Sequence, residues 1–156
     1  MAIGSYQTNC YFVYREDSKK AVVIDPADNG AQIYSALERN GFTVEAILLT
    51  HGHFDHIWGS NELREVSGAK IYALDEEKVL CEDVKYNLSA MVGRAYTVVP
   101  DEYVREGQVL TFDNMDFKVI ATPGHTIGSC CYYVEKAGIL ISGDTLFQES
   151  RSEERR

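Results

Sequence analysis

A short run of residues with three histidines and an aspartate constrains this chain more than any other feature of its sequence. The run reads THGHFDH over residues 50–56, and it follows the apolar segment Val44–Leu49, which predicts a short buried strand. Side chains two positions apart point the same way on an extended backbone, so we expect His51, His53 and Asp55 on one side. The sequence therefore predicts a cluster of metal-binding groups at the end of a strand.

The residue types in this run suit a metal ion. Neutral imidazoles bind zinc and similar cations, and a carboxylate adds a harder oxygen ligand. Gly52 allows the loop to turn closely around an ion, and His56 points away and can serve a neighbouring centre. The alternative is a solvated loop that is rich in histidine. Four ligand-type residues within six consecutive positions favour the metal site.

Three further polar residues follow predicted strands. His125 comes after a Pro-Gly turn, Asp144 follows a glycine, and Asp25 precedes a proline. Each of them alone is typical of a turn or a cap. Beside a half-formed metal site, His125 supplies a third imidazole and Asp144 a carboxylate that two cations can share. Asp25 suits an acceptor for the second ring nitrogen of a ligand histidine, and a turn role is equally consistent with its position.

Length and charge narrow the class of protein. The 156 residues predict one domain over residues 1–156, and a net charge of −9 disfavours binding to nucleic acid. No apolar run is long enough to span a membrane, and the start has no signal-peptide pattern, so we expect no membrane association and a cytoplasmic location. The cysteines form no C-x-x-C pair and are expected to be reduced and buried: Cys10, Cys81, Cys130 and Cys131.

The remaining pattern alternates strands and helices first and then becomes rich in strands. It predicts helices over Gly30–Arg39, with Asp28 as the cap, and over Ile57–Val66, while Glu76–Asn87 is broken helix or loop. Strands are expected at Tyr11–Tyr14, Ala21–Asp25, Val44–Leu49, Ala69–Ala73, Gln108–Phe112, Phe117–Ala121, Ser129–Val134 and Gly138–Ile141. This order predicts an α/β or α+β sandwich.

Five short segments carry a resemblance to a known family. They are NCY at 9–11, VIDP at 23–26, THGHFDH at 50–56, PGHT at 123–126 and GDTLF at 143–147. In this order they resemble the metallo-β-lactamase superfamily, and the THGHFDH segment is the most specific of them. The chain looks most similar to the small glyoxalase II-like (hydroxyacylglutathione hydrolase-like) branch. The resemblance implies a four-layer αββα sandwich with a metal site at the edge between its two sheets.

The resemblance also implies a site for two metal ions. The family pattern places the first ion on His51, His53 and His125, the second on Asp55 and His56, and a bridging carboxylate on Asp144. Zinc is the expected metal, as one or two ions, with iron or manganese as alternatives. The B1 class of β-lactamases carries a cysteine where this chain has Asp144, which disfavours antibiotic hydrolysis.

The implied activity is hydrolysis of a thioester, such as an acylglutathione, by hydroxide that the metal generates from bound water at neutral pH. Asp55 is the expected catalytic residue, because it can hold this hydroxide and relay its proton. The implied partner is a small-molecule substrate. Two alternatives stay open. One is a persulfide (sulfur) dioxygenase of the same fold with a single iron, and the other is an inactive, shortened form that still binds metal.

The end of the chain departs from the family pattern. Family members continue past GDTLF through further helix and strand to a final histidine, whereas this sequence departs at Arg151 and ends in the charged tail Glu153–Arg156. We therefore expect a C-terminally incomplete sandwich and a weaker second metal site. An uncovered sheet edge and apolar surface are expected to lower stability or to cause self-association.

Overall fold

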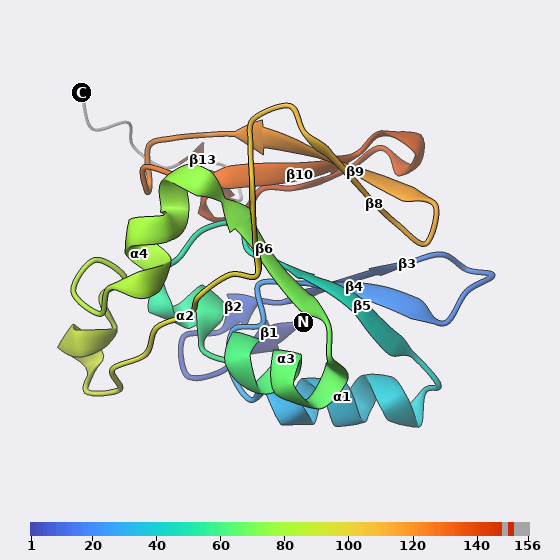
Figure 1. Ribbon diagram of the computed structural model, residues 1–156, viewed down its shortest axis with the longest axis horizontal. Coiled ribbons are helices and arrows are strands. Elements are labelled where there is room, and N and C mark those ends of the chain that lie inside the picture. Colours follow the sequence, from blue (N-terminus) through green and yellow to red (C-terminus); the bar gives the residue numbers. More distant parts are fainter. Residues whose placement is uncertain (148–149, 152–156) are drawn as a thin grey trace.

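The computed structural model contains two stacked β-sheets, with helices against the outer face of one of them (Figure 1). It describes residues 1–147 and 150–151. The strands of the larger sheet are β3 (Tyr11–Tyr14), β4 (Lys20–Ile24), β5 (Thr43–Leu48), β6 (Lys70–Leu74) and β7 (Glu102–Val104), paired in that order. The second sheet contains β8 (Val109–Phe112), β9 (Met115–Ala121), β10 (Cys130–Val134) and β11 (Ile139–Ile141), and its order is β11-β10-β9-β8. Two short pairs join β1 (Ala2–Ile3) to β2 (Thr8–Asn9) and β12 (Leu146–Phe147) to β13 (Ser150–Arg151).

The helices are short. The α-helices are α1 (Gly30–Arg39), α2 (Phe54–Ile57), α3 (Ser60–Ser67) and α4 (Lys78–Glu82). Single 3₁₀ turns occur at η1 (Asp75–Glu77), η2 (Ser89–Val92), η3 (Glu135–Ala137) and η4 (Gly143–Thr145). Helix α1 coincides with its sequence prediction because its apolar positions share one face, on which Ile33 and Leu37 are buried.

The five-stranded sheet is mixed and covered on both faces. Strands β3 and β4 pair antiparallel, and β4 to β7 run parallel. A parallel strand covered on both sides reads as a continuous apolar run. The four residues Ala21–Ile24 of β4 are accordingly all buried. This sheet therefore separates two apolar cores.

The four-stranded sheet is antiparallel and alternates along its strands. In β9, Phe117 and Val119 are buried, whereas Lys118 between them is exposed. The buried set faces the larger sheet, and the exposed face carries apolar side chains as well, since Val109 is 53% and Leu140 45% exposed. Alternation of this kind is expected when one face of an antiparallel sheet packs on a core.

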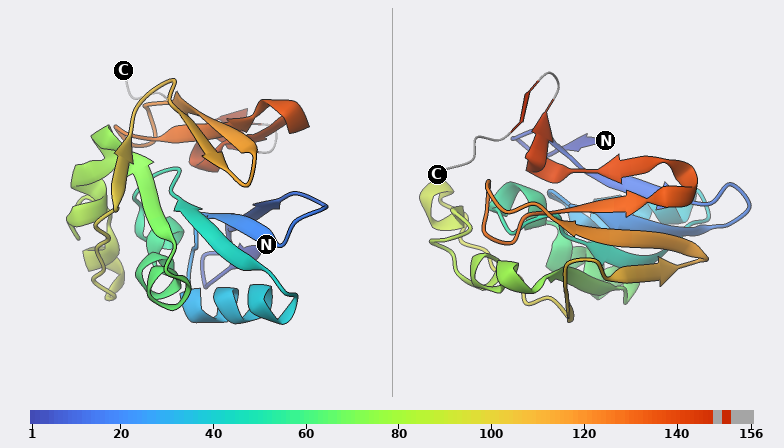
Figure 2. Two further views of the ribbon diagram at one scale, coloured as in Figure 1. Left: turned by 45° about the vertical axis from the view of Figure 1, so that its right-hand side comes forward. Right: turned by 90° about the horizontal axis from the view of Figure 1, so that it is seen from above.

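Helices α1 and α3 cover the outer face of the five-stranded sheet, and the four-stranded sheet stacks on its other face (Figure 2). One core lies between these helices and the larger sheet, and includes Ile33, Leu63 and Ile71. The other lies between the sheets, and includes Leu48 and Tyr132. The expected mixed α/β sandwich is confirmed. Within the described ranges, helices cover the five-stranded sheet alone.

The prediction of one helix over Ile57–Val66 is wrong, because α2 ends at Ile57 and a separate helix, α3, begins at Ser60. The Gly59 N–H donates to the Pro26 carbonyl at 2.7 Å, which interrupts the helical hydrogen bonds between α2 and α3. A Cβ at Gly59 would lie 2.7 Å from the same carbonyl oxygen. Contact with a distant segment therefore breaks a helix whose local pattern is continuous.

Asp28 does not cap α1, which corrects a second prediction. The cap position is Asn29, whose φ of 52° lies in the left-handed region, and it makes no side-chain capping bond. Asp28 Oδ1 instead accepts the Asn29 N–H and a hydrogen bond from Arg94. The strand β7 was not predicted, because a three-residue strand is too short to show a period.

Several expectations concern the chain ends and the cysteines. All four cysteines are free and buried, as expected, and burial raises the pKa of Cys10 to about 12. None of the helices in the described part of the chain is both long and apolar enough to cross a bilayer. The charged tail Glu153–Arg156 lies outside the described residues.

One buried hydrogen bond joins the two sheets and can be tested. The Tyr132 hydroxyl donates to the Leu49 carbonyl at 2.8 Å, and both residues are fully buried. The variant Tyr132→Phe should lower the free energy of unfolding by about 1–3 kcal/mol, because the buried carbonyl loses its hydroxyl donor and keeps only the weak Cys130 thiol at 3.7 Å. Urea denaturation measures the change. Tyr133→Phe, one position along the same strand on the opposite face, should change it by less than about 0.5 kcal/mol. Equal effects of the two variants would contradict this role.

Candidate metal centre

The residues singled out in the sequence lie on loops at one edge of the two sheets. They are His51 and His53 in the loop after β5, Asp55 and His56 on α2, His125 in the loop after β9, and Asp144 in η4 after β11. Gly143 lets the Asp144 turn approach closely, because a Cβ there would lie 2.3 Å from Thr50 Oγ1 and its φ is +49°. Packing of the two sheets therefore brings residues from distant parts of the sequence to one place.

Three imidazoles form the first group. Ligand nitrogens of His51, His53 and His125 all lie within 4.8 Å of one another. His53 Nδ1 and His125 Nε2 are 2.9 Å apart, and the three ring centroids are separated by 4.7 to 4.9 Å. The structure thus brings together the three histidines that the sequence analysis assigned to one ion.

A second group adjoins the first and shares His51. It consists of His51, His56 and Asp144, whose ligand atoms again lie within 4.8 Å of one another. Asp144 Oδ1 is 3.2 Å from His56 Nε2, and its Oδ2 is 3.5 Å from His125 Nε2. Asp144 therefore belongs to the second group through Oδ1, and its Oδ2 faces His125 of the first group.

Asp55 does not lie on an extended backbone, although the two-residue spacing predicts one. The backbone is extended at His53, but α2 begins at the next residue, so Asp55 lies on its first turn and not on an extended strand. Its Oδ2 is 3.7 Å from His56 Nε2 and accepts a 2.7 Å hydrogen bond from Thr8 Oγ1. The expectation that Asp55 lines the same extended side as His51 is wrong for this reason. Asp55 instead lies beside His56.

The first group suits a divalent cation. His51 is 1% exposed, and its Nε2 is buried without a hydrogen-bond partner among the described residues. A buried polar atom without a partner is costly, and a cation supplies one. Burial, together with the charges of neighbouring imidazoles, lowers the pKa of His51 well below its ordinary value and that of His53 to about 4. Both rings are therefore neutral at pH 7, the form that binds metal.

Asp25 contacts His56 of the second group at the ring nitrogen that does not face Asp144. Its fully buried carboxylate accepts the Thr50 N–H at 2.8 Å and the Thr50 hydroxyl at 2.6 Å, and Oδ2 lies 2.9 Å from His56 Nδ1. Burial opposes the charged form of His56, but the Asp25 and Asp144 carboxylates outweigh it and raise the pKa to about 10. Of the two roles that the sequence left open, contact with the second ring nitrogen of a candidate ligand is the one observed.

Comparison with known families agrees with this geometry. The model of the Metallo-beta-lactamase superfamily matches residues 3–156. The chain belongs to this superfamily. Membership identifies the chain as a metallohydrolase-type protein. The histidine-rich groups described above are its candidate metal site.

Two relatives within the superfamily have informative names. The chain is 38% identical over 150 residues to "Probable metallo-hydrolase YqgX" of Bacillus subtilis, covering 95% of this chain and 70% of that protein. It is 28% identical over 149 residues to "Hydroxyacylglutathione hydrolase GloC" of Haemophilus influenzae, covering 94% and 70%. The chain thus spans about 70% of the length of both.

Two solved structures are similar over nearly the whole chain. The B3 metallo-β-lactamase BLEG-1 has a TM-score of 0.90 at 37% identity, covering 97% of this chain and 74% of that one. TTHA1623, solved in a di-iron-bound form, has a TM-score of 0.83 at 30% identity, covering 98% and 75%. The fold expected from the superfamily is therefore confirmed.

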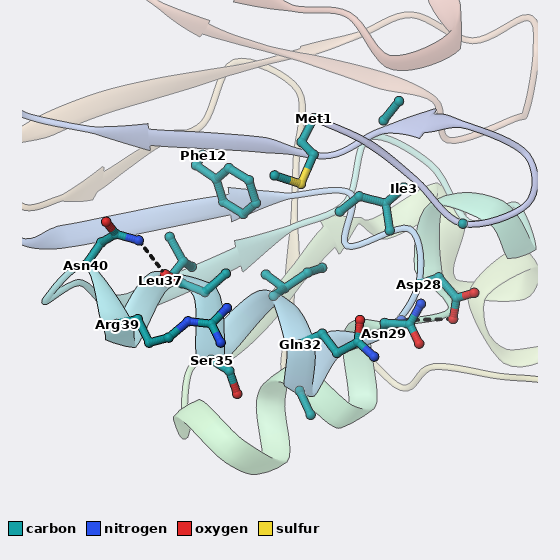
Figure 3. A pocket seen from close by; sticks show the side chains of 15 residues that line it. Met1, Ile3, Phe12, Asp28, Asn29, Gln32, Ser35, Leu37, Arg39 and Asn40 are labelled. Carbon is teal, nitrogen blue, oxygen red and sulfur yellow. Dashed lines mark hydrogen bonds between the residues drawn. The ribbon is translucent and has the colours of Figure 1, made fainter.

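A cavity of about 430 Å³ opens beside the second group. It is lined by Tyr6, Gln7, Thr8, Asn9, Tyr11, Asp55, His56, Gly143, Asp144 and Leu146. Its volume falls in the range of sites for small ligands. A separate cavity of about 920 Å³ lies between α1 and the N-terminal residues, with Met1, Phe12 and Leu37 on its walls (Figure 3). The two share no lining residue, so the smaller one is the cavity next to the metal-binding groups.

Sequence reasoning missed two residues that contact the site. Thr8, whose hydroxyl holds Asp55, belongs to a two-residue strand without a recognisable pattern. Glu77 is fully buried and contacts both histidine loops, whereas the adjacent Glu76 is exposed. An acidic run in a predicted loop contains no signal that distinguishes these two glutamates.

The Asp25 carboxylate should be essential to the stability of this edge. The amide of Asp25→Asn has only one acceptor oxygen where the carboxylate meets Thr50 and His56, so the variant should lose about 1.5–3 kcal/mol of unfolding free energy. The measurement is chemical denaturation with a chelator present, so that metal does not contribute. Asp17→Asn, at a carboxylate that is 70% exposed, serves as the control and should stay within about 0.5 kcal/mol. A variant Asp25→Asn as stable as the control would refute the role.

Proposed function

We propose that this protein is a metal-dependent hydrolase of thioesters, such as acylglutathione-type substrates. The observation that carries the proposal is the convergence of three imidazoles, one of them with a buried nitrogen that has no hydrogen-bond partner among the described residues, beside a second group of histidine and carboxylate. A loop without a ligand would have to keep these groups together at a cost, and a cation removes that cost.

Six residues would hold the metal. They are His51, His53 and His125 for a first ion, Asp55 and His56 for a second, and Asp144 between them. We propose zinc because nitrogen-rich sites suit it, with iron or manganese as alternatives. TTHA1623, which is 30% identical, was solved with two irons, and this supports iron as the first alternative. A bound divalent cation lowers the pKa of water toward neutrality and polarises a carbonyl group.

Residues of the chain itself would orient the attacking water and accept its proton. Asp55 lies beside His56 and lines the smaller cavity, and the Thr8 hydroxyl donates to one of its carboxylate oxygens. A carboxylate held in this way can orient the attacking water and take its proton. Asp25 fixes the His56 ring by its contact with Nδ1, so that Nε2 faces Asp144.

A thioester fits this set of groups. The departing thiolate is a weak base, so its release needs no strong general acid, and the attacking group needs no serine or cysteine nucleophile. The cysteines are buried, which agrees with a reaction that does not use them. The named hydroxyacylglutathione hydrolase relative, at 28% identity, supports the same substrate class. The cavity beside the second group would receive the small-molecule substrate.

A second candidate is β-lactam hydrolysis. It is favoured by the 37% identity and TM-score of 0.90 to a protein described as a B3 metallo-β-lactamase. The persulfide dioxygenase would use the same three histidines with one iron, and the inactive form would bind metal without turnover. These alternatives differ in metal and product, so one set of assays separates them.

The first test is metal content together with product analysis. Removal of metal by a chelator should abolish thiol release from S-lactoylglutathione, and Zn²⁺ should restore it, because the bound cation would supply the activation of the attacking water. A chromogenic cephalosporin and glutathione persulfide with an oxygen electrode are assayed in parallel. Iron with oxygen consumption would support the dioxygenase, and β-lactam turnover alone would support the second candidate. Tight metal binding without any turnover would support the inactive form.

The second test concerns Asp55. The variant Asp55→Asn should lower kcat for thioester hydrolysis by about 10²–10⁴-fold, the usual contribution of an acid–base group, because the amide cannot accept a proton. Steady-state kinetics at saturating zinc measure the effect. Asp116→Asn, on the four-stranded sheet away from the site, should retain wild-type kcat. A change of less than threefold for Asp55→Asn would remove Asp55 from the chemistry.

A further inference from the structure

We infer that Glu77 is a positioning residue that holds the two histidine loops in register for metal binding. This inference rests on the metal site of the proposed function and not on the thioester substrate. Glu77 belongs to η1, between the larger sheet and α4, and it is not one of the residues of either ligand group.

The Glu77 carboxylate bridges the two loops directly. Its Oε1 accepts the Gly52 N–H at 2.7 Å, and Gly52 separates His51 from His53. Its Oε2 accepts the Gly128 N–H at 2.8 Å and the Thr126 hydroxyl at 3.0 Å, on the loop of His125. One oxygen therefore serves each loop. All three partners donate, so an ionised carboxylate satisfies every one of them.

The backbone of both loops is packed closely against the η1–α4 segment, so closely at Gly128 that only glycine fits. A Cβ at Gly128 would lie 2.4 Å from Glu77 N and 2.6 Å from its Oε2. A Cβ at Gly52 would lie 3.0 Å from Cys81 N, in the helix that follows. Such contacts leave little room for movement, so the η1–α4 segment fixes each loop by sterics as well as by hydrogen bonds.

The Glu77 carboxylate is fully buried and is stabilised by hydrogen bonds, without a cationic partner among the described residues. Glu77 is 0% exposed, and no lysine, arginine or histidine of the described residues forms an ion pair with it. Burial raises the pKa of Glu77, while its hydrogen bonds from Gly52, Thr126 and Gly128 oppose the rise. A buried carboxylate whose side-chain hydrogen bonds all come from the two ligand-bearing loops serves those loops more directly than the general core.

The geometry of the ligands depends on this bridge. His53 and His125 come from different loops, and their nitrogens must stay about 3 Å apart to share an ion. Loss of groups that orient metal ligands commonly costs 10–100-fold in metal affinity. A loose bridge would let the loops separate without unfolding either core.

The test uses Co²⁺ binding to the full chain. The variant Glu77→Gln is nearly isosteric but turns an amide N–H₂ toward one loop, where it meets a donor. We expect the Kd for the first Co²⁺, measured by competition with a chelator, to rise 10–100-fold, and the visible Co²⁺ bands to change in intensity. The matched control is Asp101→Asn, whose carboxylate accepts the Ile71 N–H at 2.9 Å far from the histidines. It should keep the wild-type Kd and spectrum.

Unfolding of each metal-free variant in urea separates positioning from stability. A normal Kd for Glu77→Gln, or a loss that Asp101→Asn reproduces at equal destabilisation, overturns the inference. If Glu77→Gln does not fold, Thr126→Val decides: it removes one donor to Oε2 and should raise the Kd by a smaller factor, and an unchanged Kd overturns the inference. Wild-type protein that binds Co²⁺ but releases no thiol from thioesters leaves this inference standing and refutes only the proposed substrate. A wild-type chain that binds no metal refutes both.

Discussion

Two hydrogen bonds between the sheets determine where everything else in the site lies. The Cys130 N–H donates to the Thr50 carbonyl at 2.8 Å, and the Tyr132 hydroxyl donates to the Leu49 carbonyl at 2.8 Å. They tie the start of β10 to the residues that immediately precede the histidine loop. Because the inter-sheet core is close-packed, this edge cannot slide without breaking both contacts. The relative position of the histidines thus follows from the packing of the sheets.

Buried carboxylates then adjust the loops on this rigid base. Asp25 accepts from Thr50 and contacts His56, and Glu77 accepts from the loops on either side of the first group. Both are fully buried, and both meet backbone N–H groups and hydroxyls. A carboxylate with several donors is a stiff connector, since each hydrogen bond to a charged group is stronger than one between neutral groups. The site therefore contains two kinds of carboxylate. Asp55 and Asp144 lie among the candidate metal ligands, and Asp25 and Glu77 hold the loops that carry the histidines.

Several elements were predictable from local pattern, and the exceptions have a common cause. The bounds of α1 and the strand β3 agree with the sequence prediction, because their apolar spacing is a local property. The break at Gly59 was not predictable, because it depends on the Pro26 carbonyl, which belongs to another part of the chain. The helical position of Asp55 was missed for a similar reason, since an apparent two-residue spacing says nothing about where an extended segment ends.

The sequence by itself determined the donor set and the family. Three histidines in a short run, a fourth after a Pro-Gly turn and aspartates at strand ends are visible without any structure. Only the tertiary structure decided that Asp144 joins the second group and faces His125 of the first, that His51 belongs to both, and that Glu77 contacts both loops. The physical reason is distance along the chain: Glu77 and its partners are 25 to 51 residues apart, and sheet packing alone makes such residues neighbours.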